Sequence, residues 1–286
     1  MNPLRTYLIV GANSPLSQRI AEKLPPEKTF VLFHSEPLNK IPKVTYIALS
    51  DLGKLPHIHV VFIISAFVPD PVNSNMHDHD LYNVNVAFIR TITDHFKSSK
   101  IVFASSVSIY KNSAEMISEN SEIAPSNSYS ISKLWGETII KRSASYSIIR
   151  ISSLIGEGVR GNTFIPMITE QAMNNNSIVL FGKGNRKQNY INCKDAAALF
   201  IKASETTKNE TYLAVSPNSY SNSEVAQTIV DLMQGTNLKY QGEDDSPSFY
   251  YDARRTYKEL DFVPEITIKA SLEEIITVSY THLRAH

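Results

Sequence analysis

The sequence has one cysteine, no net charge and no long hydrophobic run. Because Cys193 is the only cysteine, an internal disulfide is excluded, and the sequence is compatible with a reducing compartment. The chain carries 28 basic and 28 acidic residues, so charge gives no reason to expect nucleic acid or an anionic membrane as a partner. The longest apolar run, "VVFIISAFV" at 60–68, is far shorter than the roughly 20 residues of a membrane span. With no signal-peptide pattern at its start, the chain is expected in the cytoplasm.

The first half alternates short apolar runs with segments of helical spacing. Strands buried on both faces are predicted at 6–12, 29–35, 44–49, 60–66, 100–106 and 146–152. Helical spacing follows the first run, recurs at 81–96, and begins again near Tyr129. Such alternation predicts an α/β protein with a parallel, doubly wound sheet.

The pattern loosens after residue 155. Helices are predicted within 161–175 and 221–234, and short strands at 178–182 and 211–215. We expect a first domain over 1–155 and a smaller α/β substrate-binding region over 156–277, interleaved with the first. The end, "VSYTHLRAH" (278–286), does not continue the helical stripe of "SLEEIIT" and is interpreted as a non-native tail.

The stretch "VGANSPLSQRIA" has the position and spacing of a dinucleotide-binding turn. Such a turn uses one glycine for the bend, one for the approach of the pyrophosphate, and one for helix packing. Here Gly11 keeps the first, while Ser14 and Ser17 replace the others. The small Ser17 still permits packing, whereas Ser14 stands where the phosphates approach. An ordinary strand–turn–helix is the alternative interpretation.

The acidic residue that usually binds the adenosine ribose is missing after the second predicted strand. His34 and Ser35 occupy that place, and Glu36 comes one residue late. The choice between NAD and NADP therefore stays open. Asp51, with Leu52 beside it, is a candidate for the adenine end, and a helix cap is the alternative role for Asp51.

A serine, a tyrosine and a lysine suggest proton-transfer chemistry. The strand "KIVFASSVSIY" brings Ser105, Ser106 and Ser108 to the edge of a parallel sheet where ligands bind. In "NSYSISK", Tyr129 and Lys133 are four residues apart and share one helix face. A lysine ammonium near the phenol lowers its pKa from about 10 and makes it usable as an acid or base. A surface Tyr–Lys pair is the alternative.

The order of these motifs resembles the extended short-chain dehydrogenase/reductase family, in its NAD-dependent epimerase/dehydratase branch. The resemblance continues in "IIRISSLIGEG", "GKGNRKQNYINCKDAAALF", "TYLAVSPNSYSNSEVAQTI" and "YYDARRTYKELDFVPEITIKASLEEII", and covers about residues 4–276. It implies a Rossmann-type sheet, an NAD or NADP cofactor (undecided), and a homodimer formed by the helices at 81–96 and 129–142.

The resemblance also assigns roles to residues. Ser106 would donate a hydrogen bond to the reacting oxygen, Tyr129 would be the acid/base, and Lys133 would bind the nicotinamide ribose and lower the tyrosine's pKa. Either Asn83 or Asn85 matches a structural asparagine. The cofactor-binding set implied by the motifs is Gly11, Asn13, Ser14, Pro15, Leu16, His34, Ser35, Asp51, Leu52, Ser65, Ala66, Tyr129 and Lys133.

Departures from the family pattern narrow the reaction. Dehydratases of the family carry an Asp–Glu pair after the catalytic serine or threonine, but this chain has Val107 and Ser108, which disfavours dehydration. A 4-epimerase or a ketoreductase acting on a sugar nucleotide remains, for example in polysaccharide biosynthesis. Two arginines that the family uses for the diphosphate are missing. Candidates for substrate contact are Ser106, Ser108, Arg160, Asn162, Arg186 and Gln188.

Two alternatives stay open. Ser14, Ser17 and the missing acidic residue are compatible with a non-catalytic or regulatory Rossmann protein, although Ser106, Tyr129 and Lys133 are all present. The missing arginines permit a reductase of a non-nucleotide carbonyl compound. The run "MHDHD" offers metal-binding residue types, but we interpret it as a solvated loop and expect no metal site; its candidates were His77, Asp78, His79 and Asp80.

Overall fold

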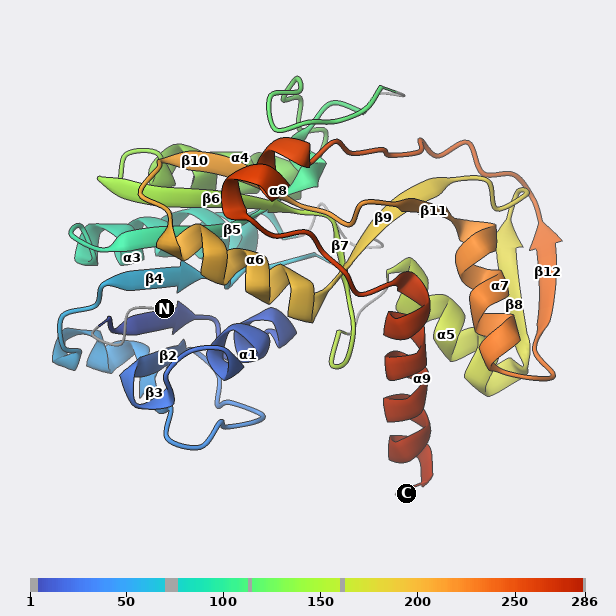
Figure 1. Ribbon diagram of the computed structural model, residues 1–286, viewed down its shortest axis with the longest axis horizontal. Coiled ribbons are helices and arrows are strands. Elements are labelled where there is room, and N and C mark those ends of the chain that lie inside the picture. Colours follow the sequence, from blue (N-terminus) through green and yellow to red (C-terminus); the bar gives the residue numbers. More distant parts are fainter. Residues whose placement is uncertain (1–4, 70–76, 113–114, 160–162, 285–286) are drawn as a thin grey trace.

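The computed structural model describes residues 5–69, 77–112, 115–159 and 163–284, and its main body is a seven-stranded parallel sheet (Figure 1). The strand order is β10-β6-β5-β4-β1-β2-β3, and every neighbouring pair is parallel. The order reverses between β1 and β4, where ligands of such sheets bind. The strands are β1 (Tyr7–Val10), β2 (Thr29–Phe33), β3 (Thr45–Ala48), β4 (Val60–Ile63), β5 (Lys100–Ser106), β6 (Ser145–Ile151) and β10 (Glu210–Ala214).

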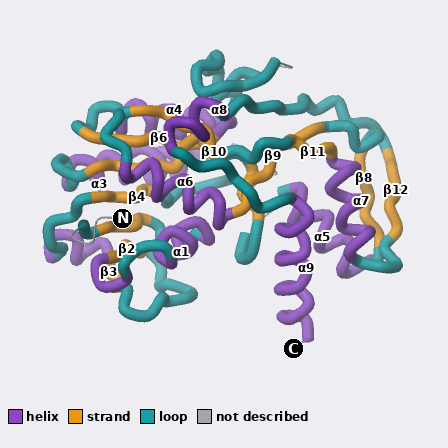
Figure 2. The backbone as a smooth tube through the Cα atoms, in the orientation of Figure 1, coloured by secondary structure: helices purple, strands orange, loops and turns teal. Residues whose placement is uncertain are grey.

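Strands β1 and β4, at the centre of the sheet, are apolar throughout because both of their faces are covered. Side chains alternate across the sheet, so Ile9 and Phe62 join the core on one face, while Leu8 and Val61 join the core on the other. Helices α1 (Pro15–Glu22) and α6 (Cys193–Glu205) supply the first core, and α3 (Phe88–His95) and α4 (Ser128–Ile140) supply the second (Figure 2). The predicted α/β fold with a doubly wound parallel sheet is confirmed.

The helix predicted at 81–96 has an interruption. It consists of α2 (Asp78–Tyr82), a π-helical segment η4 (Asn83–Ala87) and α3. π-Helical segments are rare and frequently lie at functional sites. The buried Asn85 belongs to this segment.

A smaller part of the chain lies beside the main sheet (Figure 1). It has a core of its own, built around residues such as Ile165, Ile168 and Ile229. The chain returns to the main sheet through α6, β10 and α8 (Arg254–Leu260), while the domain boundary at residue 155 stays a prediction. The remaining elements are β7 (Ser153–Ile155), α5 (Phe164–Asn175), β8 (Ser177–Phe181), β9 (Lys187–Asn192), β11 (Ser219–Ser221), α7 (Asn222–Leu232), β12 (Asn237–Gln241) and α9 (Ile268–Arg284).

Helix α9 corrects one expectation about the C-terminal end. The helical stripe was expected to stop before residue 278, but the helix runs on to Arg284. The segment 278–284 contains neither glycine nor proline, so nothing in its backbone chemistry ends a helix. A non-native origin of residues 278–286 stays a prediction. Within the described residues, no helix is long and apolar enough to cross a membrane.

Candidate active site

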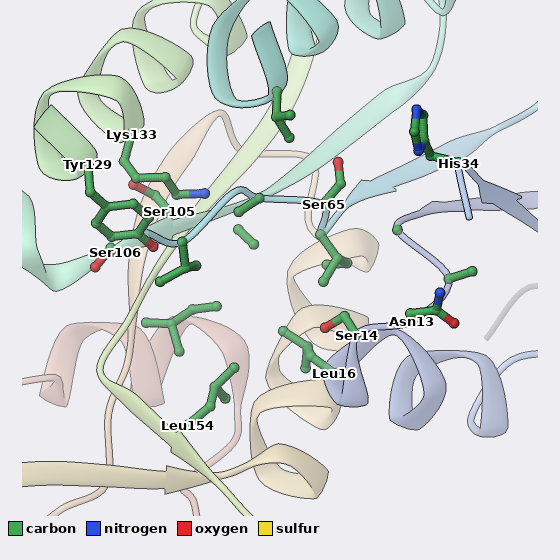
Figure 3. A pocket seen from close by; sticks show the side chains of 18 of the residues that line it. Asn13, Ser14, Leu16, His34, Ser65, Ser105, Ser106, Tyr129, Lys133 and Leu154 are labelled. Atoms are coloured by element: carbon green, nitrogen blue, oxygen red, sulfur yellow. The ribbon is translucent and has the colours of Figure 1, made fainter. Parts of the chain in front are cut away.

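A cleft of about 520 Å³ lies at the carboxyl ends of the central strands (Figure 3). Its lining comes from the segments that directly follow β1, β2 and β4, from β5 and α4, and from the chain at and after the end of β6, with single residues of α1 and η4. Tyr129, Lys133, Ser105 and Ser106 lie at one end, and His34 and Asn13 lie at the other (Figure 3). The residues of the sequence prediction that line the cleft are Gly11, Asn13, Ser14, Leu16, His34, Ser35, Ser65, Ala66, Ser106, Tyr129 and Lys133.

Gly11 makes the tight turn between β1 and α1. Its φ is +114°, and an added Cβ would lie 2.8 Å from the backbone nitrogen of Ser65. Only glycine fits such a position without strain. Ser14 is the N-cap of α1, but its side chain makes no capping hydrogen bond. The turn therefore presents a helix N-terminus and an uncommitted hydroxyl to the cleft, which fits a pyrophosphate.

Ser17 shows why loss of the third glycine is tolerated. The side chain is buried in the first turn of α1, and its hydroxyl has no hydrogen-bond partner. A serine is small enough for the helix to pack against the sheet, as expected. The cost is a buried hydroxyl without a partner, which is unfavourable by about 1–3 kcal/mol.

The start of α4 places Tyr129 and Lys133. Asn127 is the N-cap, and its side chain accepts a hydrogen bond from the backbone nitrogen of Ser130 at 2.9 Å. The hydroxyl of Ser130 bonds back to the backbone nitrogen of Asn127 at 3.2 Å, which completes a capping box. Tyr129 therefore lies in the first helical turn and Lys133 one turn later, both facing the cleft.

Ser106 lies at the end of β5, next to the tyrosine. Ser106 is near enough to the phenol of Tyr129 to lower its pKa as a hydrogen-bonding neighbour. The Ser106 hydroxyl also donates to the hydroxyl of Ser108 at 2.9 Å and accepts from the backbone nitrogen of Ser108 at 3.1 Å. Ser108 therefore supports Ser106 and does not itself line the cleft. The serine and the tyrosine can act on one substrate oxygen.

Burial, and not the neighbouring lysine, dominates the pKa of Tyr129 in the chain alone. The surrounding protein raises the pKa of Tyr129 to about 12, and the lowering influence of the neighbouring Ser106 counters only part of this. The expected lowering by Lys133 is therefore wrong for the chain without a cofactor. Burial also lowers the pKa of Lys133 to about 8, against a smaller raising effect of Glu137. The lysine ammonium lies 4.8 Å from the ring centroid of Phe103.

A buried polar network next to Ser106 and Lys133 was not predicted. Ser105 donates to the carboxylate of Glu137 at 2.6 Å, and Arg150 binds the same carboxylate through two nitrogens, at 2.9 and 2.8 Å. Arg150 also donates to the hydroxyl of Tyr110 at 2.7 Å. The signals were present in the sequence: Glu137 follows Lys133 by one helical turn, and Arg150 interrupts an apolar strand.

Of the two candidate asparagines, Asn85 is the one that is buried and hydrogen-bonded. It is fully buried, and its side chain accepts from the backbone nitrogen of Phe67 at 2.8 Å and donates to the carbonyl of Phe67 at 2.9 Å. It also donates to Ser132 in α4 at 3.0 Å. Asn83 is exposed. Asn85 therefore ties the segment after β4 to helix α4.

Several predicted cofactor residues lie outside the cleft lining. Asp51 pairs with Lys54 at 2.7 Å in the 3₁₀ segment η2 (Leu49–Lys54), and Leu52 packs into the core. Pro15 is the first residue of α1 and does not line the cleft. Their roles toward a cofactor stay predictions.

The predicted substrate residues are dispersed. Arg186 donates to the carbonyl of Pro247 at 3.3 Å, and Gln188 donates to Asn222 at 3.0 Å; neither lines the cleft. Arg160 and Asn162 lie outside the described residues. Several other lining residues were not predicted from the sequence, among them Val68, Val84, Ile151, Ser152 and Leu154. Ile151 and Ser152 lie where β6 ends, and this strand end was the available signal for them.

The remaining reactive residues have ordinary surroundings. Cys193 is buried, as predicted, and burial raises the pKa of its thiol to about 12. His77 pairs with Asp80 at 3.6 Å beside α2. In the part of the chain that the structure describes, no group of three or more histidine, cysteine or acidic residues could hold a metal ion.

Known proteins resemble this chain in sequence and in fold. Over 232 residues it is 26% identical to the dTDP-4-dehydro-6-deoxyglucose reductase of Escherichia coli, covering 76% of this chain and 73% of that protein. The structure of UDP-glucuronic acid 4-epimerase from Bacillus cereus, in complex with UDP-glucuronic acid and NAD, has a TM-score of 0.85 at 17% identity, covering 97% and 99% of the two chains. A dTDP-glucose 4,6-dehydratase from Bacillus anthracis, in complex with NAD, has a TM-score of 0.80 at 16% identity, covering 98% of each chain.

Structural likeness at these identities shows the fold alone. The family is shown by a family model described as "NAD dependent epimerase/dehydratase family", which matches residues 27–214. The matched segment contains the Ser106, Tyr129 and Lys133 constellation, while the Gly11 turn precedes it. The resemblance recognised in the motifs is thereby confirmed, and the chain belongs to the NAD-dependent epimerase/dehydratase family.

Proposed function

We propose that the protein is an NAD(P)-dependent oxidoreductase or epimerase acting on a sugar nucleotide. The observation that carries this proposal is the position of Ser106, Tyr129 and Lys133 at one end of the cleft whose other end is formed by the Gly11 turn and His34. A dinucleotide laid across the sheet edge would bring its nicotinamide to the tyrosine and its adenosine to His34.

The side chains have separable tasks. The bound nicotinamide would exchange a hydride with the sugar carbon that carries the reacting hydroxyl. Tyr129 would take the hydroxyl proton during oxidation and return it during reduction, and Ser106 would donate a hydrogen bond to the same oxygen. Lys133 would bind the nicotinamide ribose. Its ammonium and the oxidised ring would then both stabilise the phenolate against the burial that raises the tyrosine's pKa.

Hydride transfer without dehydration fits the residues after Ser106. Val107 and Ser108 occupy positions 107 and 108, and neither offers a carboxyl group to protonate a leaving hydroxyl. Epimerisation and simple reduction both need only one acid/base. The family includes dehydratases, so the proposal rests on these two residues.

A nucleotide sugar is the substrate class we propose. Matched relatives include a reductase and a putative epimerase named for such substrates. Arg186 and Lys187, beside β9, are the cations nearest in sequence to the position where the family places an arginine. A non-nucleotide carbonyl compound is the second candidate, because no arginine lines the cleft among the described residues. Arg160 lies outside them.

We further propose a cytoplasmic homodimer. The exposed rings of Tyr82 in α2 and Trp135 in α4 lie 5.6 Å apart between centroids, and Ile131 is exposed beside them on α4. An apolar patch of this kind suits a second copy of the chain. Light scattering of the purified protein would measure the mass; a monomer at working concentration would remove the homodimer from the proposal.

A substrate panel tests the activity. Purified protein would be incubated with UDP- and dTDP-hexoses, their 4-keto derivatives and simple ketones, with each nicotinamide cofactor, and products would be separated by chromatography. We expect turnover of a nucleotide sugar and a loss of at least about 10²-fold in kcat for Tyr129→Phe. Tyr240→Phe, at an exposed tyrosine of β12 outside the cleft, is the matched control. Retained turnover in Tyr129→Phe would exclude the proton-transfer role, and absence of any cofactor binding would favour a non-catalytic Rossmann protein.

A further inference from the structure

Among the described residues, no acidic side chain lines the adenosine end of the cleft. The only charged side chain among the described residues that line the cleft is Lys133, which lies at the opposite end (Figure 3). At the adenosine end the lining side chains include His34, Ser35 and Asn13. His34 and Ser35 directly follow β2 and are exposed, so they are accessible to a ligand.

Glu36, the carboxylate nearest in sequence to His34 and Ser35, does not reach into the cleft. Glu36 does not line the cleft; its side chain is 78% exposed, and one oxygen lies 3.8 Å from the ammonium of Lys40. Asn13 holds this loop in place: its side chain accepts from the backbone nitrogen of Leu38 at 2.9 Å and donates to the carbonyl of Glu36 at 3.2 Å. Both ends of the asparagine amide are therefore used to fix the loop.

This arrangement bears on which dinucleotide can bind. A carboxylate after the second strand accepts the ribose 2′-hydroxyl of NAD, and its negative charge repels the 2′-phosphate of NADP. Like charges placed together in an interface cost several kcal/mol. Without such a carboxylate the repulsion is absent, and the imidazole of His34 and the hydroxyl of Ser35 can both donate hydrogen bonds to a phosphate.

We propose that the protein binds the 2′-phosphorylated dinucleotide at least about as tightly as the unphosphorylated one, with His34 and Ser35 facing the 2′ position. The inference rests on the proposed function, because it assumes a dinucleotide in the cleft. It adds that a site belonging to an NAD-dependent family has lost discrimination against NADP in this chain. The described lining residues include no arginine that would favour NADP strongly. We therefore expect the protein to bind both NAD and NADP.

Calorimetric titration of the full chain with NAD and with NADP tests the inference without any substrate. We expect dissociation constants that differ by less than about tenfold, or a lower value for NADP; tenfold corresponds to about 1.4 kcal/mol. His34→Asp should weaken NADP binding by more than about tenfold and leave NAD binding within about threefold, because it restores the carboxylate. If His34→Asp fails to fold, Ser35→Asp serves the same purpose.

Glu36→Gln is the matched control, since it changes a carboxylate in the same loop. We expect it to leave both dissociation constants unchanged. A preference for NAD of more than tenfold that disappears in Glu36→Gln would overturn the inference by showing that Glu36 reaches the ribose. A preference for NAD that persists in that variant would overturn it as well. Saturable binding of NAD alone thus leaves the proposed function standing, whereas binding of neither dinucleotide by folded protein would overturn both.

Discussion

Glu137 of α4 and Arg150 of β6 form a buried, bidentate ion pair. The side chain of Glu137 is fully buried and that of Arg150 is 3% exposed, and two nitrogens of the guanidinium contact both carboxylate oxygens. Ser105 donates to the same carboxylate, one residue before Ser106. The pair therefore joins the helix that carries Tyr129 and Lys133 to the two strands beneath it.

Removing either partner of this pair should be costly. Arg150→Leu or Glu137→Leu would leave an uncompensated charge in the interior, which costs about 3–5 kcal/mol. The double variant should lose less than the sum of the single variants, because no buried charge is left alone. The measurement is the free energy of unfolding in urea for the four members of the cycle.

An exposed ion pair in the same protein provides the control for this cycle. Lys111 and Glu122 lie 2.8 Å apart, with side chains 56% and 65% exposed. Lys111→Ala and Glu122→Ala should each cost less than about 1 kcal/mol because water screens the pair. Equal costs for the buried and the exposed cycles would contradict the assignment of Glu137 and Arg150 as a structural anchor.

At neutral pH, the protein with Lys133 should be less stable than the variant with methionine at the same position. Burial lowers the pKa of Lys133 to about 8, from 10.5 for an unperturbed lysine. Below pH 8 the folded protein holds a desolvated ammonium. Between pH 8 and 10.5 the folded state loses this proton while the unfolded state keeps it, so this contribution to stability rises with pH. Lys133→Met should stabilise by up to the order of 3 kcal/mol at pH 7, and the gain should shrink as pH approaches 10.5.

Unfolding curves of both proteins at pH 7, 8.5 and 10 would measure this difference. Lys202→Met is the control, because this lysine of α6 has a side chain that is 41% exposed. Its effect should be small and should not vary with pH over this range. A Lys133→Met variant less stable than wild type at pH 7 would show that the contact of the ammonium with Phe103 outweighs desolvation.

The sequence predicted most of the main sheet because its strands are apolar on both faces. Runs such as "TYLIVGA" suit strands buried on both faces, and their alternation with helical segments predicts a parallel, doubly wound sheet. Ser106, Tyr129 and Lys133 were predicted because strand ends and the i, i+4 rule place side chains without tertiary information. The π-helical segment Asn83–Ala87 was not predicted, because the helical spacing of apolar residues runs through it without a change; within it, Asn85 binds the backbone of Phe67, a contact that no local pattern shows.

Two features depended on burial that no local pattern shows. The pKa of Tyr129 reflects how much protein surrounds the phenol, so reasoning from Lys133 alone gave the wrong direction. Glu137 and Arg150 lie in elements predicted separately, and their pairing needs the registry of α4 against β6. Charged residues in apolar segments, Arg150 above all, were the available signal, since an isolated buried charge is very unfavourable.

Gly11→Ala should destabilise the protein and weaken dinucleotide binding. The residue has φ of +114°, and an alanine Cβ would lie 2.8 Å from the backbone nitrogen of Ser65, which cannot move freely within the sheet edge. Backbone strain and overpacking together should cost about 2–5 kcal/mol. In the control Gly53→Ala the new Cβ meets no atom within 4 Å, so stability should change by less than about 1 kcal/mol. Similar losses in both variants, measured by urea unfolding, would contradict the steric explanation.

Asn85→Ala should destabilise the cofactor edge of the sheet more than the exposed Asn83→Ala does. The substitution removes three hydrogen bonds and leaves the backbone groups of Phe67 without their partner. An unsatisfied buried group costs about 1–3 kcal/mol, so we expect a loss of about 2–4 kcal/mol for Asn85→Ala and within about 0.5 kcal/mol for Asn83→Ala. Hydrogen exchange at the backbone amide of Phe67 provides a local readout, because this N–H donates its hydrogen bond to the side-chain oxygen of Asn85. Faster exchange in Asn85→Ala alone is the expected result; unchanged exchange would mean that the segment after β4 is held by its backbone and not by this side chain.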